Sequence, residues 1–243
     1  MQTLHDHLEK IHITPLGLMR IKENLHLEDE DIVLWCQETI KKADLIIGQG
    51  KNWYVYHQGV VITIHAKSYT LITAKLLDPR IRKMEKSDFL VLPEFLYQAI
   101  FIPEGSHPLS RDIIQVPEIN VYIDHFGSKQ GDLGVVAEQN GQIIGAAWTR
   151  IICAYGHVDD ETPELAISIL PEFRGYGIGT KLMKKLFTLL QTDGFKQTSL
   201  SVEKRNPAFH FYKRLGYEII MEKLDDEGQG DYIMMKSLKI TKK

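Results

Sequence analysis

A glycine-rich segment between a predicted strand and a predicted helix is the sharpest chemical feature of the chain. It reads Arg174-Gly175-Tyr176-Gly177-Ile178-Gly179-Thr180. A helix N-terminus presents main-chain N–H groups that have no partner within the helix, and it carries a partial positive charge. Glycines let the chain turn tightly and remove Cβ atoms that would block an approaching anion. We therefore expect the segment to bind a phosphate or a diphosphate, with a charge-assisted contact from Arg174.

Two other phosphate-binding loops do not fit this segment. The glycines follow the order Gly-x-Gly-x-Gly, which lacks the Gly-x-Gly-x-x-Gly spacing of a dinucleotide-binding turn. A Walker loop is excluded because no Gly-Lys-Ser or Gly-Lys-Thr follows. Two alternatives stay open: a glycine turn that only starts a helix, and a general cradle for nucleotide phosphates.

A second motif lies further along the chain. It reads Asn206-Pro207-Ala208-Phe209-His210-Phe211-Tyr212-Lys213-Arg214-Leu215-Gly216-Tyr217. The two motifs in series resemble the GNAT acetyltransferase superfamily. The glycine segment resembles its acyl-CoA pyrophosphate loop, Gln/Arg-x-x-Gly-x-Gly/Ala. The second motif resembles the segment that carries the family's asparagine, alanine, tyrosine and Gly-Phe/Tyr positions. The order of predicted elements over residues 80–238 also resembles that family.

The resemblance implies a fold, an activity and a set of site residues. The fold is α/β (α+β), with a mixed, mostly antiparallel sheet flanked by helices. The activity is transfer of an acetyl group from acetyl-CoA to an amine, with Tyr212 as the general acid that protonates the leaving thiolate. The residues implied to bind the cosubstrate are Ile169, Leu170, Arg174, Gly175, Tyr176, Gly177, Ile178, Gly179, Thr180 and Asn206, the first two through main-chain N–H groups near the acyl carbonyl. For Tyr212 the alternative is aromatic packing, and Asn206 could equally cap the helix that follows it.

The general base is less well defined by the sequence. An amine with a pKa near ~10.4 is mostly protonated at neutral pH, so a carboxylate or a water chain must remove a proton. Glu164 lies on the strand that leads into the glycine segment and is our candidate, although a shift of one residue in register would turn it to the other face. The acidic run Asp159-Asp160-Glu161 could instead bind a cationic amine or be a solvated loop. Histidine side chains can relay protons, so His157 and His125 are weaker candidates.

The stretch from Phe95 to Phe126 is rich in aromatic residues and prolines. We expect it to form a wall of the acceptor cleft, or alternatively a loop packed for stability.

Hydrophobic periodicity and turn residues predict the elements that carry these motifs. Asn140-Gly141, between two strand-like runs, favours a tight hairpin turn. The predicted strands of this block are 81–84, 133–139, 142–148, 164–170, 198–202, 217–221 and 232–236, and its helices are 89–101, 180–191 and 207–215.

Residues 1–78 form a separate block that ends at the breaker Asp78-Pro79. One helix is predicted at 15–25, and a second has an acidic start at Asp29-Glu30-Asp31 and Lys41 and Lys42 in its last turn. Strands follow at 53–56, 60–64 and 69–73, and these elements make a small α+β domain with a three-strand meander. The block resembles a small bacterial domain family of unknown function. We interpret it as an accessory domain for partner binding or dimer formation, and residues 79–243 as the acetyltransferase domain.

Composition limits the remaining function classes. The formal net charge is -3, and residues 1–78 hold 8 Lys/Arg against 10 Asp/Glu, so neither block favours nucleic acid. No apolar run reaches the ~20 residues of a membrane span, and the first residues lack a secretion signal. Cys36 and Cys153 stand alone, which predicts neither a metal site nor a disulfide framework. We expect a cytoplasmic protein that binds no metal ion and no membrane.

Two functions compete on these observations. The first is an N-acetyltransferase that moves an acetyl group from acetyl-CoA to a primary amine of a small molecule or a peptide, by direct attack in a ternary complex. The second is a non-catalytic acyl-CoA-binding sensor or adaptor with a partner-binding N-terminal domain. A homodimer is an open alternative in either case.

Overall fold

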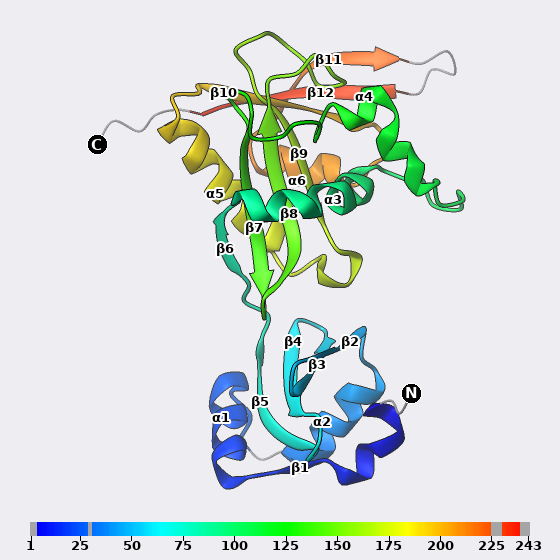
Figure 1. Cartoon of the computed structure of the whole chain (residues 1–243), viewed down its shortest axis with the longest axis vertical. Helices are drawn as coiled ribbons and strands as arrows, with labels where there is room; N and C mark the ends of the chain where they lie inside the picture. Colours follow the sequence, from blue (N-terminus) through cyan, green and yellow to red (C-terminus); the bar gives the residue numbers. More distant parts are fainter. Residues whose placement is uncertain (1–3, 29–30, 225–229, 239–243) are drawn as a thin grey trace. The chain divides into compact units, whose positions relative to one another are not determined.

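The computed structural model describes residues 4–28, 31–224 and 230–238. The chain divides into two compact units, Met1–Asp78 and Pro79–Lys243. Figure 1 labels their helices and strands.

The N-terminal unit is built on a five-stranded sheet with the strand order β1-β5-β4-β3-β2. The predicted meander is present as β3, β4 and β5, and β2 extends it by antiparallel pairing with β3. The short β1 pairs in parallel with β5, through His12 opposite Thr70 and Ile13 opposite Leu71. The elements are a kinked 3₁₀ segment Leu4–Lys10, β1 His12–Ile13, α1 Pro15–Leu25, α2 Ile32–Lys41, β2 Leu45–Gln49, β3 Asn52–His57, β4 Val60–His65 and β5 Thr70–Leu76.

Local capping explains where the two helices of this unit begin. The Thr14 side chain accepts a hydrogen bond from the main-chain N–H of Gly17, and Pro15 occupies the first helical position of α1. In α2, Asp31 Oδ1 accepts from the N–H groups of Val33 and Leu34. The other two residues of the predicted acidic start, 29 and 30, lie outside the described residues.

The C-terminal unit is built on a seven-stranded sheet with the order β11-β12-β10-β9-β8-β7-β6. Neighbouring strands are antiparallel except β9 and β10, which are parallel. The predicted mixed, mostly antiparallel sheet is therefore confirmed. Its strands are β6 Arg80–Lys83, β7 Leu133–Gln139, β8 Gln142–Arg150, β9 Glu164–Ile169, β10 Gln197–Glu203, β11 Glu218–Leu224 and β12 Gly230–Ser237.

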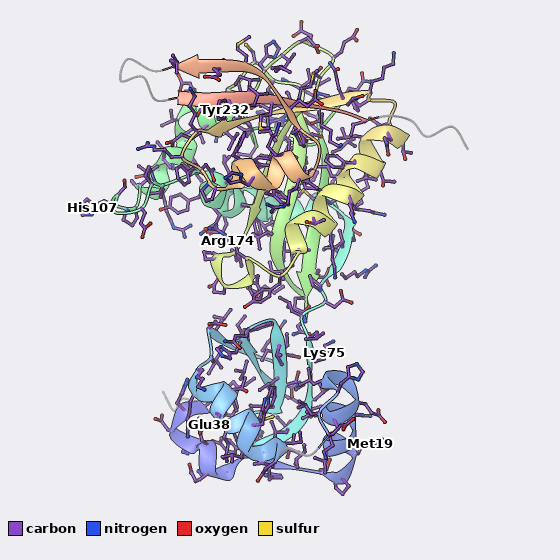
Figure 2. The ribbon with its side chains drawn as sticks, turned by 180° about the vertical axis from the view of Figure 1, so that it is seen from behind. Met19, Glu38, Lys75, His107, Arg174 and Tyr232 are labelled. Atoms are coloured by element: carbon purple, nitrogen blue, oxygen red, sulfur yellow. The ribbon has the colours of Figure 1, made fainter. Side chains whose placement is uncertain are left out.

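Helices cover both faces of this sheet (Figures 1 and 2). On one face, α3 packs with Trp148 and Val136 in a core that Phe126 and Tyr122 border. On the other face lie α5 and α6, and α5 buries Leu182 and Leu186. The helices are α3 Leu92–Ala99, α4 Pro117–Asn120, α5 Ile178–Thr192 and α6 Ala208–Arg214, and 3₁₀ turns occupy Lys86–Val91, Arg111–Gln115 and Pro171–Phe173.

The predicted hairpin is present between β7 and β8. Asn140 and Gly141 both have positive φ angles, 53° and 77°, as a type I′ turn requires. The helix predicted over 89–101 is shorter, because residues 86–91 form a 3₁₀ turn and α3 begins only at Leu92. Asp88 is the third residue of this turn and accepts from the N–H of Glu85 at 2.7 Å, which forms one half of a capping box.

Candidate active site

A cavity of about 710 Å³ opens in the C-terminal unit. Four segments line it: the end of α3 with the residues after it, the second half of β9, the glycine segment with the start of α5, and α6 with the residues that lead into it. The lining residues are Tyr97, Gln98, Ala99, Ile100, Phe101, Ile102, Ile167, Ser168, Ile169, Arg174, Gly175, Gly177, Ile178, Gly179, Thr180, Asn206, Pro207, Ala208, Phe211, Tyr212 and Arg214. The two sequence motifs thus meet in one cavity.

The glycine segment leaves its inner surface free of side chains. Gly175 and Gly177 have φ angles of 85° and 75°, and a Cβ atom built on either would meet no atom within 4 Å. Gly177 is the N-cap of α5, so the N-terminal N–H groups of a 15-residue helix begin there. Gly179 has a different role, because its Cβ would lie 3.2 Å from Cζ of Phe211. The first two glycines leave open space beside the segment, and the third allows α6 to pack closely against α5.

The strands β9 and β10 diverge beside this segment. Among the described residues they form one pair, Glu164 opposite Ser199 at the first residue of β9. Beyond it the register between the strands is lost, and Ile167, Ser168 and Ile169 line the cavity instead. The sheet therefore opens between its two central parallel strands.

The register of β8 and β9 decides which main-chain groups point into the opening. The N–H of Leu170 donates to the carbonyl of Ile144 at 3.0 Å, and Ile169 lies opposite Gly145. Because antiparallel pairs alternate between hydrogen-bonded and non-hydrogen-bonded, the N–H groups of Ile169 and Ile167 point away from β8, towards the opening. The Leu170 N–H is already used within the sheet, and Leu170 does not line the cavity. Of the two predicted N–H donors, Ile169 alone faces the opening.

Arg174, labelled in Figure 2, makes hydrogen bonds to other residues of the protein. Its Nε donates to the carbonyl of Ile169 at 2.8 Å, and Nη2 lies 3.4 Å from the carbonyl and Oε1 of Gln98. Partial burial of the guanidinium lowers the pKa of Arg174. A second cation, Arg214, reaches the cavity from the last turn of α6. With two arginines and no carboxylate among the described lining residues, the cavity suits an anionic ligand.

The two candidate residues of the second motif both line the cavity. Asn206 Oδ1 accepts from the N–H of Ala208, the first residue of α6, at 2.9 Å. This hydrogen bond at the helix start is compatible with a contact between Asn206 and a cosubstrate. Tyr212 lies on α6, and burial raises its pKa to about 12. A phenol with this pKa keeps its proton at neutral pH and can act as a proton donor.

Glu164 lies outside the cavity lining, at the pair where β9 and β10 meet. The residue is 2% exposed, and its Oε1 accepts from the Tyr122 hydroxyl and from the N–H of Gly156, the latter at 2.7 Å. Its Oε2 is buried and has no hydrogen-bond partner among the described residues. Burial raises the pKa of this carboxyl. The structure thus separates Glu164 from the glycine segment and places it at the closed end of the strand opening.

The other predicted candidates lie elsewhere. Asp159 accepts from the N–H of Glu161 at 2.9 Å and from Gln197 at 3.3 Å, which orders the loop before β9. None of residues 159–161 lines the cavity, and neither do Tyr176, His125 and His157. Of the stretch from Phe95 to Phe126, residues 97–102 form one wall of the cavity.

Comparison with known proteins decides the family. The GNAT acetyltransferase domain pattern matches residues 130–219. The [ribosomal protein bS18]-alanine N-acetyltransferase of Haemophilus influenzae is 37% identical over 139 residues, which are 56% of this chain and 80% of that protein. The chain is a GNAT acetyltransferase. Its N-terminal unit matches DUF3781, a family described as a protein of unknown function, over residues 5–75.

A solved structure agrees with this assignment at the level of the fold. A Desulfovibrio desulfuricans protein assigned to the GNAT acetyltransferases is 17% identical and superposes with a TM-score of 0.50, over 67% of this chain and all of that chain (100%). The Escherichia coli ribosomal-protein-S18-alanine N-acetyltransferase is 19% identical, with a TM-score of 0.49 over 68% of this chain and 97% of that chain.

Sequence reasoning missed several residues of this GNAT site. Arg214, Gln98 and Phe211 line the cavity, and Tyr122 contacts Glu164. Arg214 follows Tyr212 by two positions, in the basic last turn of the same helix. That position near the candidate acid could have indicated a second cation in the cavity. Tyr122 lies 42 residues from Glu164, and no spacing rule connects them. In the described parts of the chain, no group of three His, Cys, Asp or Glu residues forms a metal site, and none of the helices is long and apolar enough to cross a membrane.

Proposed function

We propose that this GNAT enzyme transfers an acetyl group from acetyl-CoA to a primary amine by direct attack in a ternary complex. The observation that supports the proposal most is the shared cavity, in which the N-terminus of α5, the opened edge of β9 and Tyr212 meet. Its volume of about 710 Å³ and its cationic, carboxylate-free lining suit a large phosphorylated cosubstrate.

The residues of the cavity divide into two sets with different tasks. The N–H groups at the start of α5, together with Arg174 and Arg214, bind the diphosphate. The inward-facing N–H of Ile169 donates to the thioester arm or to its carbonyl oxygen, where negative charge develops during the attack. Because these donors belong to a strand and a helix end, they are fixed before the cosubstrate binds.

The reaction needs one proton removed and one supplied. The amine nitrogen forms a bond with the acetyl carbonyl carbon, the carbon–sulfur bond breaks, and the amine loses a proton. Glu164 takes that proton through water, because a direct transfer would be too long. Ile167 is the first residue of β9 that lines the cavity, and it is three residues from Glu164, roughly 10 Å along an extended strand. Tyr212 gives its proton to the departing thiolate, which leaves as the thiol of coenzyme A.

The acceptor belongs to the class of primary amines. The relative from Haemophilus influenzae is named for an alanine of ribosomal protein bS18. A peptide with an N-terminal alanine is therefore the first acceptor to test, beside lysine peptides and polyamines.

The experiment measures coenzyme A release from acetyl-CoA with each acceptor, together with the mass of the product. We expect one amine class to gain a single acetyl group, with Tyr212→Phe strongly impaired in turnover but not in cosubstrate binding. Tight binding of acetyl-CoA without turnover on any acceptor would support the sensor alternative instead.

A further inference from the structure

The geometry points to Tyr122 as a positioning residue for the acyl transfer: its hydroxyl, with the N–H of Gly156, holds Oε1 of Glu164, so that Oε2 alone is left to accept a proton. This inference rests on the role proposed above for Glu164. The evidence for it is the set of hydrogen bonds to Glu164 and the contacts that fix the two donors, Gly156 and Tyr122.

The Glu164 side chain has one occupied and one free oxygen. Both donors, the hydroxyl of Tyr122 and the N–H of Gly156, bind the same atom, Oε1. Oε2 is buried and has no partner in the described part of the chain, and the same is true of Oγ of Ser199, the residue paired with Glu164 across the strands. A buried polar atom without a partner is costly and rare in folded proteins. Two of them on paired residues, where β9 and β10 begin to diverge, mark a place for a polar ligand atom or a water molecule.

The donor Gly156 is held by its surroundings. A Cβ atom at this position would lie 2.6 Å from the main-chain carbon of Leu200 and 2.7 Å from the nitrogen of Ser201. The loop before β9 therefore lies directly against the backbone of β10, and a glycine is needed for that approach. Its N–H cannot move away from Glu164 without moving the loop.

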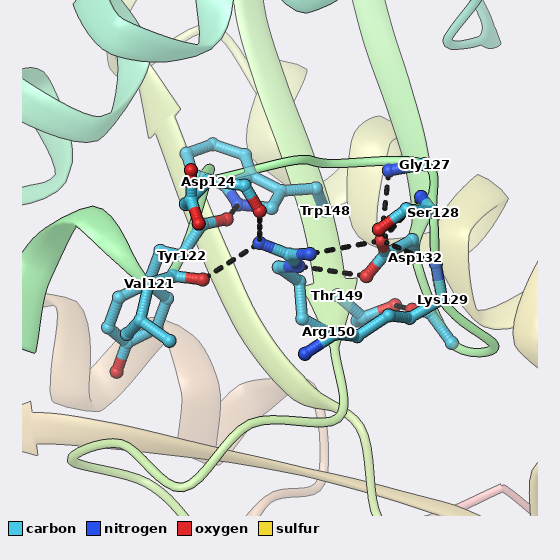
Figure 3. Close-up of polar contacts among 11 residues, drawn as sticks. Val121, Tyr122, Asp124, Gly127, Ser128, Lys129, Asp132, Trp148, Thr149 and Arg150 are labelled. Carbon is cyan, nitrogen blue, oxygen red and sulfur yellow. Dashed lines mark hydrogen bonds and ion pairs between the residues drawn. The ribbon is translucent and has the colours of Figure 1, made fainter.

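Tyr122 is held by an independent set of contacts (Figure 3). Its carbonyl accepts from Nε1 of Trp148 at 3.0 Å. Arg150, which lies opposite Glu164 on β8, donates Nη1 to the carbonyls of Val121 and Asp124 at 2.8 and 2.6 Å. The guanidinium is in turn paired with Asp132, at 2.8 Å from Nε to Oδ1. Main-chain carbonyls on both sides of the tyrosine, one residue before it and two residues after it, are therefore held by Arg150, which restricts the position of its ring and hydroxyl.

The groups that face Glu164 come from every element around it. Tyr122 and Gly156 donate hydrogen bonds to it, and Ser199 is its partner on β10. Burial has the largest effect on the pKa of Glu164 and raises it, while the nearby Lys223 and His157 have smaller effects that lower it. Arg150 faces the same region, but Asp132 already neutralises it. The Tyr122 hydrogen bond also lowers the pKa of Glu164, so its removal is expected to raise that pKa.

Tyr122→Phe tests the inference, because it keeps the ring and removes one hydroxyl. Activity is measured as kcat/KM for acetyl transfer across the acid and neutral range. We expect the acid limb to move to higher pH, and a rise of one pKa unit corresponds to an approximately tenfold loss of kcat/KM below the new pKa. Tyr232→Phe, outside the cavity lining, is the matched control and is expected to leave the profile unchanged. An unchanged acid limb in Tyr122→Phe, with active parent enzyme, would overturn the inference.

A second measurement does not depend on turnover. Infrared titration of the carboxyl bands in the full chain without acetyl-CoA, with Glu164→Gln to identify the band of Glu164, gives its pKa directly. We expect a higher pKa in Tyr122→Phe than in the parent protein. If the parent enzyme acetylates no amine but this shift is present, the proposed function fails and the positioning contact stands. If the band does not shift, the positioning role is overturned whatever the activity.

Discussion

The guanidinium of Arg174 donates through Nε to the carbonyl of Ile169, five residues before it. The bond ties the start of the glycine segment to the end of β9, where the N–H of Ile169 faces the strand opening. One side chain therefore holds two parts of the proposed cosubstrate site together, and its charge is only one of its expected contributions.

Replacement of Arg174 separates these contributions. In Arg174→Ala we expect an approximately tenfold weaker affinity for coenzyme A, the equivalent of about 1.4 kcal/mol. Arg174→Lys keeps the charge but not the planar donor that reaches Ile169. Its affinity, measured by calorimetry, is expected to be closer to that of the alanine variant. Full recovery of binding in the lysine variant would show that charge alone matters.

Tyr212 is expected to act as an acid across the whole working range of the enzyme. Because burial raises its pKa to about 12, the phenol stays protonated at neutral pH. In Tyr212→Phe we expect kcat to fall ~10²-fold with an unchanged acid limb, since proton transfer to sulfur is lost at every pH alike. The measurement is kcat across pH by coenzyme A release. A loss confined to one end of the profile would contradict this role.

The buried carboxyl of Glu164 predicts a dependence of stability on pH. Its pKa in the folded protein is raised above the ordinary value of 4.5, so the folded state binds this proton more tightly than the unfolded state does. Its contribution to the free energy of unfolding is therefore present below that ordinary value and is lost as the pH rises through the raised pKa.

Glu164→Gln removes that charge and keeps an oxygen for Tyr122 and Gly156. We expect the variant to be inactive, yet to have a higher melting temperature than the parent above the raised pKa. The free-energy difference is about 1.4 kcal/mol for each unit by which the pKa is raised. Calorimetric melting at several pH values measures it. A parent protein that gains stability over the same pH window, relative to the variant, would refute the assigned direction.

The buried pair of Arg150 and Asp132 is expected to carry much of the local stability. Its side chains are 2% and 0% exposed, and Asp132 Oδ2 also accepts from the N–H groups of Gly127, Ser128 and Lys129 (Figure 3). Asp132→Asn leaves a buried guanidinium without its counter-charge, which costs about 3–5 kcal/mol.

Hydrogen exchange of the β8 amides at increasing urea concentration measures this loss. The exposed substitution Asp160→Asn is the control, and its effect is expected to stay within about 0.5 kcal/mol. Equal effects of the two substitutions would contradict a stabilising role for the pair.

The two cysteines are expected to differ in reactivity. Cys36 is buried in the N-terminal unit, and burial raises the pKa of its thiol to about 12, whereas Cys153 is exposed. Because the thiolate is the reactive form, a thiol reagent at neutral pH is expected to modify Cys153 alone in the folded protein. Both thiols react after unfolding. Rapid modification of Cys36 in the native state would show that the core of this unit opens readily.

The parts of the protein that could be predicted from sequence are those that local chemistry determines. Asn140-Gly141 favours positive φ angles and so places the hairpin, Thr14 caps α1, and the two motifs predict the family and the cavity. The prediction was less complete where pairing partners are distant. The strand β2 was missed because Gly48 and Gln49 resemble a turn, and only pairing with β3 makes them a strand.

The sequence by itself therefore determined the family and indicated the glycine segment and the candidate acid, because short-range spacing on a strand, a turn and a helix defines these motifs. Tertiary structure decided the burial and the hydrogen bonding of Glu164. Its burial, its contact with Tyr122 from 42 residues away and its place at the strand pair with Ser199 depend on chain segments that only the folded sheet brings together. Tertiary structure also decided that Arg174 donates to the carbonyl of Ile169. A long side chain can reach many acceptors, and the fold determines which carbonyl lies within hydrogen-bond distance.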